Sequence, residues 1–207
     1  MRKTVLLITA ICLLSFNAAQ AQLEKGKIMT GVASTISLGG AWGSELMSLG
    51  FISSEGDYKE TIINLLPRGG YFIMDNFVVG LDIVASLYTE KHSETGDSWT
   101  QNILGGGPFT RYYYPLEKFY PFGELSVIFG QETEKYKSAS YEGEEKWSVL
   151  MFTLGPGVAI PIAERATVDL MAGYSLVTRT YKDAMEDGKE TCSGVIIKAG
   201  FTIYLGQ

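Results

Sequence analysis

The sequence predicts an all-β protein, specifically an eight-stranded antiparallel up-and-down transmembrane β-barrel with short periplasmic turns and four longer extracellular loops. Three observations lead to this fold class. Alternating segments rich in β-branched and aromatic residues recur along the 207 residues, short and long connections alternate between them, and a secretory signal precedes the first segment. No later apolar run is long enough for a spanning helix, which excludes a helical membrane protein.

Residues 1–21 are the predicted cleaved signal peptide. Arg2 and Lys3 precede the apolar run TVLLITAICLLSF, and the small residues Ala19 and Ala21 supply the cleavage site. The run is too short to span a bilayer as a helix, which disfavours the alternative of a transmembrane anchor. The predicted mature chain, residues 22–207, forms one outer-membrane β-barrel domain.

Eight segments match the strand pattern, and the residues between them carry turn and loop signals. The segments run approximately Lys27–Leu38, Lys59–Phe72, Phe77–Tyr88, Gln101–Leu116, Phe119–Gln131, Trp147–Ile162, Ala166–Thr178 and Gly194–Leu205. Tight breaks are predicted at Met74–Asn76, Leu116–Lys118 and Ala163–Arg165. Long polar loops are predicted near 39–58, 89–100, 132–146 and 179–193.

The two faces of these segments favour a membrane barrel over a soluble one. In the last segment, one face carries large apolar residues such as Val195 and Phe201, whereas the other carries Lys198, Gly200 and Thr202. A soluble secreted calyx of the lipocalin kind would turn many charges outward to water. Here the polar face has small residues and about one charge per strand, which suits a narrow lumen.

Charged residues on the inward face lie at similar depths from the short turns. Three are basic and three are acidic, so mutual pairing would avoid the cost of an isolated charge in a narrow interior. The predicted interior charge belt consists of Arg68, Asp82, Arg111, Glu124, Asp169 and Lys198. We expect it to act as a structural plug, because an eight-stranded barrel is just wide enough to be filled by side chains. The alternative is a proton- or ion-conducting path.

The stretch GPFTRYYYPLEKFYPFGE combines basic and aromatic residues, but strand alternation divides them. It turns Arg111 with Phe109 and Tyr113 inward, and it turns Tyr112 and Tyr114 outward near the short turn. Outward aromatic residues at this level are typical of the girdles that contact lipid headgroups. The predicted membrane-interface aromatics are Tyr71, Phe77, Tyr112, Tyr114, Phe119 and Tyr204.

Charge and composition exclude several functions. The whole chain has a formal charge of −6, and the predicted mature chain is more acidic because Arg2 and Lys3 leave with the signal, which disfavours binding to nucleic acid. Cys192 is the one cysteine of the mature chain, so no intrachain disulfide forms, and the single histidine, His92, cannot build a zinc site. Pairing of His92 with Ser93 for catalysis is less favoured than a solvated polar loop. We therefore predict no catalytic, cofactor-binding or metal site and no enzyme activity.

Three stretches, PRGGYFIMDNFVVGLDI, GPFTRYYYPLEKFYPFGELSVIFG and the closing AGFTIYL, together resemble the OmpA/OmpX-like superfamily of small outer-membrane β-barrels of Gram-negative bacteria. The resemblance covers essentially the whole mature chain. It implies a place in the outer membrane in contact with lipid, reached with periplasmic chaperones and the barrel-assembly machinery. It implies no activity.

Two functions remain open at this point. One is a structural or interaction role in the cell envelope, with the surface loops binding an unknown ligand. The other is a narrow channel or small-solute transporter. The acidic loops could also be simply a solvated face, and Cys192 could be incidental.

Overall fold

The computed structural model describes the chain except for residues 1–22, 39–48, 54–57, 115, 182–187 and 207, so the predicted signal peptide lies outside the described residues. Nearly all the rest is strand. The strands are β1 (Ile28–Leu38), β2 (Leu49–Ser53), β3 (Tyr58–Leu65), β4 (Pro67–Met74), β5 (Phe77–His92), β6 (Ser98–Tyr113), β7 (Tyr120–Lys137), β8 (Glu142–Ala163), β9 (Ala166–Tyr181) and β10 (Lys189–Leu205). In the described part of the chain, no helix is long and apolar enough to cross a membrane.

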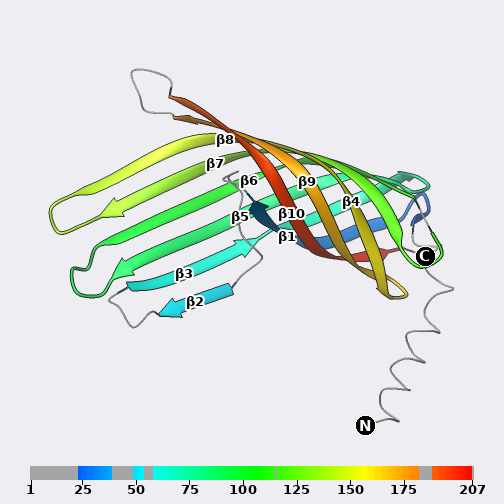
Figure 1. Ribbon diagram of the computed structural model, residues 1–207, viewed down its shortest axis with the longest axis horizontal. Helices are drawn as coiled ribbons and strands as arrows, with labels where there is room; N and C mark the ends of the chain where they lie inside the picture. The colour runs from blue at the N-terminus through cyan, green and yellow to red at the C-terminus, as the bar shows by residue number, and fades with distance from the viewer. Residues whose placement is uncertain (1–22, 39–48, 54–57, 115, 182–187, 207) are drawn as a thin grey trace, which may run out of the picture.

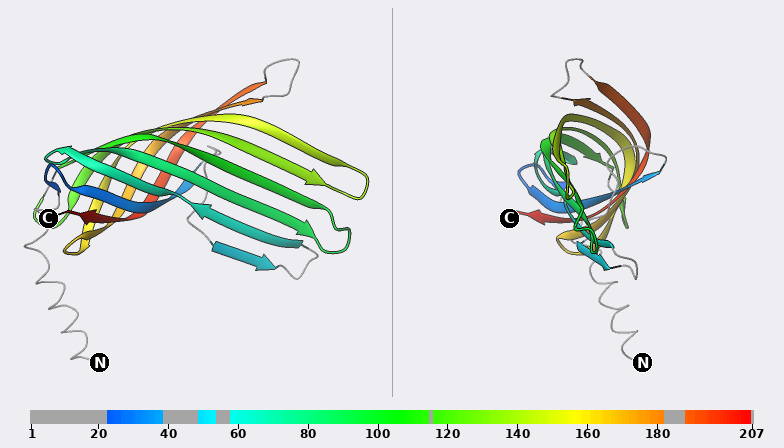
Figure 2. Two further views of the ribbon diagram at one scale, coloured as in Figure 1. Left: turned by 180° about the vertical axis from the view of Figure 1, so that it is seen from behind. Right: turned by 90° about the vertical axis from the view of Figure 1, so that its left-hand side faces the viewer.

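Eight strands close into a ring of antiparallel neighbours. From β4 the ring runs through β1, β10, β9, β8, β7 and β6 to β5, and β5 pairs back to β4. The view along the molecule in Figure 2 shows this ring end-on. The predicted fold class is confirmed.

The second predicted strand is divided in two. β3 and β4 both pair with β5, and the break falls at Leu66, immediately before Pro67. Proline has no backbone N–H to donate to a ladder, so an interruption at this point is physically reasonable. β1 pairs with β4 as far as Val32 opposite Pro67, while the short β2 pairs with β3 outside the ring.

Two of the connections predicted as long loops are largely hydrogen-bonded hairpins. The β5–β6 ladder continues to Lys91 opposite Ser98, and the β7–β8 ladder continues to Lys137 opposite Glu142. Figure 1 shows both hairpins projecting well beyond the ring. We refer to these projecting ends as the outer hairpins. The apolar alternation used to assign strands ends before they do, because beyond that point both faces carry polar residues.

Large apolar side chains cover the outside of the ring. Leu81, Phe129, Leu154 and Val195 are among those exposed on different strands. On β7 the outward positions change from the apolar Phe129 to Gln131, where the apolar band ends. A continuous apolar exterior of this extent is unfavourable in water and suits the hydrocarbon of a bilayer.

Aromatic and apolar side chains fill the interior at the short-turn end. The buried cluster comprises Leu23, Met29, Phe72, Val78, Phe109, Tyr113, Tyr120, Phe122, Ala159, Met171 and Tyr204. The segment before β1 belongs to this closure, because the carbonyl of Leu23 accepts a hydrogen bond from the Asn76 N–H at 2.7 Å. Asn76 lies in the β4–β5 turn with φ of 65°, a left-handed conformation that asparagine tolerates well. This end of the barrel is therefore packed shut.

Candidate functional site

The structure brings all six residues of the charge belt together inside the barrel. Strand register explains the first contacts, since Arg68 on β4 lies opposite Asp82 on β5, and Arg111 on β6 lies opposite Glu124 on β7. Each of the six has at most 8% of its surface exposed. The six residues lie on six different strands. They are Arg68 on β4, Asp82 on β5, Arg111 on β6, Glu124 on β7, Asp169 on β9 and Lys198 on β10.

Glu124 is the centre of the belt. Its carboxylate accepts hydrogen bonds from Arg68 Nη1 at 3.0 Å, from Arg111 Nε at 2.8 Å and from Lys198 Nζ at 2.9 Å. Three cations therefore converge on one buried anion. Such an arrangement stabilises the anion but would leave excess positive charge without further carboxylates.

Two aspartates supply the missing negative charge. Asp82 accepts a two-pronged interaction from Arg68, at 2.9 Å from Nε and 3.0 Å from Nη2. Asp169 pairs with Arg111 and also accepts hydrogen bonds from the hydroxyls of Thr167 at 2.7 Å and Thr202 at 2.9 Å. With three acids and three bases the belt has no net formal charge, and each acid is bonded to a base.

Aromatic rings support the two arginines. The guanidinium of Arg68 lies 4.3 Å from the centre of the Phe109 ring, and that of Arg111 lies 3.9 Å from the centre of the Phe122 ring. Glycines make room for these rings, since a Cβ at Gly80 would meet Phe109 and one at Gly157 would meet Phe122. Inward glycines thus permit a packing that larger residues would block.

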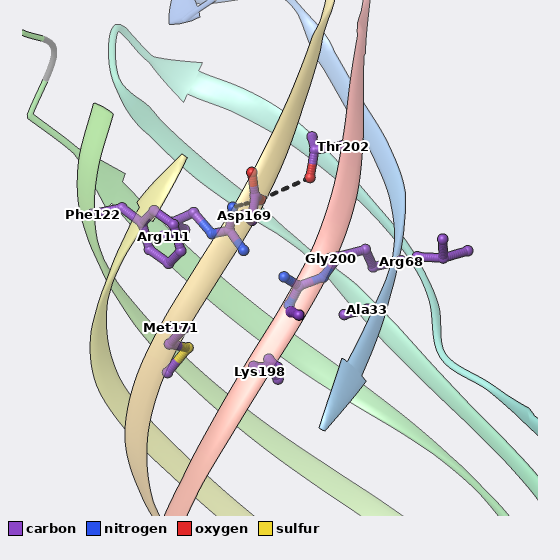
Figure 3. A pocket seen from close by; sticks show the side chains of 11 residues that line it. Ala33, Arg68, Arg111, Phe122, Asp169, Met171, Lys198, Gly200 and Thr202 are labelled. Atoms are coloured by element: carbon purple, nitrogen blue, oxygen red, sulfur yellow. Dashed lines mark hydrogen bonds and ion pairs between the residues drawn. The ribbon is translucent and has the colours of Figure 1, made fainter. Parts of the chain in front are cut away.

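Very little empty space remains in the belt. The cavity there has a volume of about 10 Å³, room for no more than about one water molecule. Figure 3 shows Arg111, Asp169 and Lys198 around this space, with the hydrogen bond from Thr202 to Asp169 drawn as a dashed line. The belt fills the lumen at its level.

Five of the predicted interface aromatics lie on the outside near the short turns. Four of them are exposed, and Phe77 is half-exposed with its ring 6.5 Å from that of Tyr112. These five residues are Tyr71, Phe77, Tyr112, Tyr114 and Phe119. Contact of their rings with lipid headgroups stays a prediction.

The prediction for Tyr204 is wrong. Its side chain is 2% exposed and lies inside the barrel, where its hydroxyl donates a hydrogen bond to the Tyr113 hydroxyl at 3.2 Å. The physical reason is strand parity, because Tyr204 shares the inward face of β10 with Lys198 and Thr202.

A second charged cluster was not predicted, and it lies beyond the apolar band at the base of the outer hairpins. Arg179 Nη2 is 2.7 Å from Glu132 and 3.2 Å from Glu134, and its guanidinium lies 4.6 Å from the centre of the Trp147 ring. Gln101 also donates to Glu132 at 2.6 Å. Burial raises the pKa of Glu132 above the ordinary value, although Gln101 and Arg179 oppose the shift. Glu132, Glu134 and Arg179 fall in segments that the sequence predicts as loops, whereas Gln101 and Trp147 are the first residues of predicted strands. The strands continue beyond the apolar alternation, and this continuation places the cluster on the inward face.

The histidine and the free cysteine lie apart from the two charged clusters. Within the described residues, no three histidine, cysteine, aspartate or glutamate side chains are grouped closely enough to hold a metal ion. His92 lies where β5 meets its turn and accepts a hydrogen bond from the Thr95 N–H at 3.3 Å. Cys192 is a partly buried free thiol.

A closed eight-stranded ring with an apolar exterior and a charge-filled interior defines a small membrane-spanning β-barrel of the outer-membrane type. The protein is accordingly an integral outer-membrane protein with an apolar exterior suited to a lipid environment.

Comparison with known proteins finds similar structures but no similar sequences. No family model matches the chain, and no curated protein sequence matches it. Among solved structures, outer membrane protein W of E. coli aligns over 87% of this chain and 98% of its own, with 17% identity and a TM-score of 0.48. OprG of Pseudomonas aeruginosa aligns over 89% and 98%, with 15% identity and a TM-score of 0.48. Ail, the attachment invasion locus protein of Yersinia pestis, aligns over 87% and 99%, with 12% identity and a TM-score of 0.45.

Proposed function

We propose that the protein is a closed, non-conducting barrel that contributes to the structure of the outer membrane and presents its outer hairpins for binding. The observation that carries the proposal is the filled lumen. The belt contains a cavity of only about 10 Å³, and its acids are each hydrogen bonded to a basic side chain.

A narrow channel is less consistent with this interior. A conducting path needs a continuous column of water or exchangeable sites, and the belt offers space for about one water. The buried aromatic cluster then blocks the short-turn end, where Tyr113 and Phe72 stack with ring centres 6.0 Å apart. We likewise assign no catalytic step to the barrel, because its buried carboxylates are engaged with cations and the cavity that Asp169 lines among the described residues has a volume of only about 10 Å³.

We infer that the chain reaches the outer membrane by export and assembly. Residues 1–21 would direct export and be removed, after which periplasmic chaperones and the barrel-assembly machinery would receive the chain. β10 would be the strand that this machinery engages, since its pairing with β1 from Ile28 opposite Leu205 to Leu38 opposite Val195 closes the ring. Fractionation of cells and N-terminal sequencing of the outer-membrane form would test both the location and the cleavage.

Planar-bilayer recording of the purified, folded chain tests the central claim. We expect no steady conductance from the natural sequence. As a control, Arg68→Ala with Arg111→Ala removes the two largest side chains of the belt and should allow ion passage if the barrel stays folded, as judged by its heat-shifted mobility on a detergent gel. Steady conductance of the natural protein that changes on Asp82→Asn would overturn the proposal in favour of the channel.

A further inference from the structure

The outer hairpins carry aromatic and acidic side chains on their inward-facing side. Two sites of this composition lie next to each other on the inward face of these strands, and we call them cups. We call the first the arginine cup, formed by Glu132, Glu134 and Trp147 around Arg179. We call the second the tip cup, a cavity of about 310 Å³ whose lining includes Glu90, Asp97, Trp99, Tyr136 and Tyr141.

The arginine cup shows what this chemistry accepts. Its occupant is a guanidinium that faces the ring of Trp147 and is held by two carboxylates. A cation is attracted to the face of an indole ring and to carboxylates together, and the attraction is stronger where water is partly excluded. The molecule's own side chain thus occupies a cation-binding arrangement.

The tip cup repeats these groups in an open position. Strand pairing sets Glu90 opposite Trp99 and Trp99 opposite Tyr136, so an acid and two rings lie side by side across β5, β6 and β7. The rings of Trp99 and Tyr136 are nearly parallel, with centres 6.4 Å apart. The cavity is large enough for a small ligand, being at the lower end of the usual range for such pockets.

The charges of the tip cup favour a cation. Glu90 and Asp97 both line it, and among the described residues neither forms an ion pair, although the Glu90 carboxylate accepts a hydrogen bond from the Tyr88 hydroxyl at 3.3 Å. Lys137 and His92 also line the cavity, and with the imidazole counted as neutral the formal charge of these groups is negative. The Tyr136 hydroxyl donates to Glu134 at 2.6 Å, and this bond is the main reason its pKa is raised to about 12, so the ring stays neutral.

We propose that the tip cup binds a small organic cation bearing a guanidinium or primary ammonium group. The cation would lie against Trp99 and Tyr136, and the carboxylates of Glu90 and Asp97 would receive its N–H groups, as Glu132 and Glu134 do for Arg179. This inference rests on the proposed binding role of the outer hairpins and names a ligand class for it.

Titration calorimetry on the full chain folded in detergent tests the inference with a matched pair of probes. Butylguanidinium carries the cation, and butylurea is its neutral isostere. We expect butylguanidinium to bind and butylurea to bind at least about tenfold more weakly, with binding of the cation weakening as salt is added. Equal binding of the two probes would overturn the proposal, as would no binding of either.

Three variants locate the site. Glu90→Gln with Asp97→Asn should weaken butylguanidinium binding by about tenfold or more, and Trp99→Leu should weaken it similarly. Glu144→Gln removes a charge from the opposite face of the same hairpin wall, where Glu144 pairs with Lys135 and Lys146, and should leave binding unchanged. A loss with Glu144→Gln equal to that of the double variant would overturn the assignment, because it would indicate attraction to overall charge.

Folding and ligand binding are measured by different methods in this experiment. Heat-shifted mobility on a detergent gel reports whether each variant is a folded barrel, and the double variant replaces two partly exposed acids by isosteres, so it should remain folded. Calorimetry does not depend on conductance. The closed-barrel proposal and the cation-binding proposal can therefore fail independently.

Discussion

Two glutamates on β7 show how the same side chain acquires opposite roles inside one barrel. Glu124 and Glu132 both point inward, and they are only 1% and 0% exposed, respectively. Glu124 is bonded to three cations within the apolar band. Glu132 lies beyond the band and shares Arg179 with Glu134, while Glu190 lies 3.7 Å from the same guanidinium.

The difference between them lies in the balance of charge. The belt has equal numbers of acids and bases in a space with almost no room for water, so each charge depends on its partners. The cluster around Arg179 has more acids than bases and lies beside open cavities of the outer hairpins. The first arrangement suits a fixed plug, and the second leaves negative potential available to a ligand.

The largest expected effect comes from neutralising Asp82 and Glu124 together as Asp82→Asn and Glu124→Gln. Two arginines and a lysine would then share the single carboxylate of Asp169, at a cost to the free energy of unfolding of roughly 3–5 kcal/mol. Urea unfolding in lipid vesicles, followed by circular dichroism, measures the midpoint. Glu144→Gln is the control, and an unchanged midpoint in the double variant would show that the belt does not stabilise the fold.

Gly157→Val tests the aromatic support of the belt without changing any charge. The added side chain would occupy the position of the Phe122 ring and displace it from Arg111. We expect a loss of roughly 2–3 kcal/mol in the free energy of unfolding, as for other overpacked interiors. The same unfolding assay applies, with Gly69→Ala as the matched control because a Cβ there meets no neighbouring atom. Equal midpoints for the two variants would contradict the packing argument.

Arg179→Gln tests whether the cluster of Glu132 and Glu134 around Arg179 needs its cation for stability, as the charge belt does. Glu132 and Glu134 would be left buried beside each other without their base, and protonation of Glu132, whose pKa burial already raises, would relieve part of their repulsion. The expected loss is therefore smaller than in the belt, roughly 1–2 kcal/mol. Hydrogen exchange should show faster exchange in the outer hairpins and little change in the ring, whereas destabilisation of the whole ring would show that the two clusters are not independent.

Glu132→Gln should have the smallest effect, below about 1 kcal/mol, because Glu134 still pairs with Arg179. The effect that distinguishes this variant is a change in how the unfolding midpoint depends on pH. The folded-state pKa of Glu132 is raised by burial, so its contribution to stability is complete below the ordinary value of 4.5 and is lost as pH rises through the folded-state value. In Glu132→Gln, stability should therefore not fall in this way as pH rises. A midpoint profile identical to that of the natural protein from acidic to neutral pH would refute this assignment.

Much of the belt could be predicted because strand alternation is a local rule. Arg68, Asp82 and Arg111 each sit in a segment with a clear apolar face, which fixes the direction of the charged side chain. The same rule turns Tyr204 inward, and choosing it as an interface residue by residue type alone gave the wrong position. The rule gave no guidance past Gln131, where no apolar face remains to set the parity.

The sequence by itself determined the ring and its two faces, because a two-residue period and the spacing of turn residues are written along the chain. Only the tertiary structure decided which charges meet. Closure of the ring and the register between strands bring Lys198 and Arg111 to Glu124, and strands continued beyond the lipid bring Arg179 to Glu132. The physical reason is that pairing depends on the relative shift of distant strands, which hydrogen bonding across the whole barrel sets.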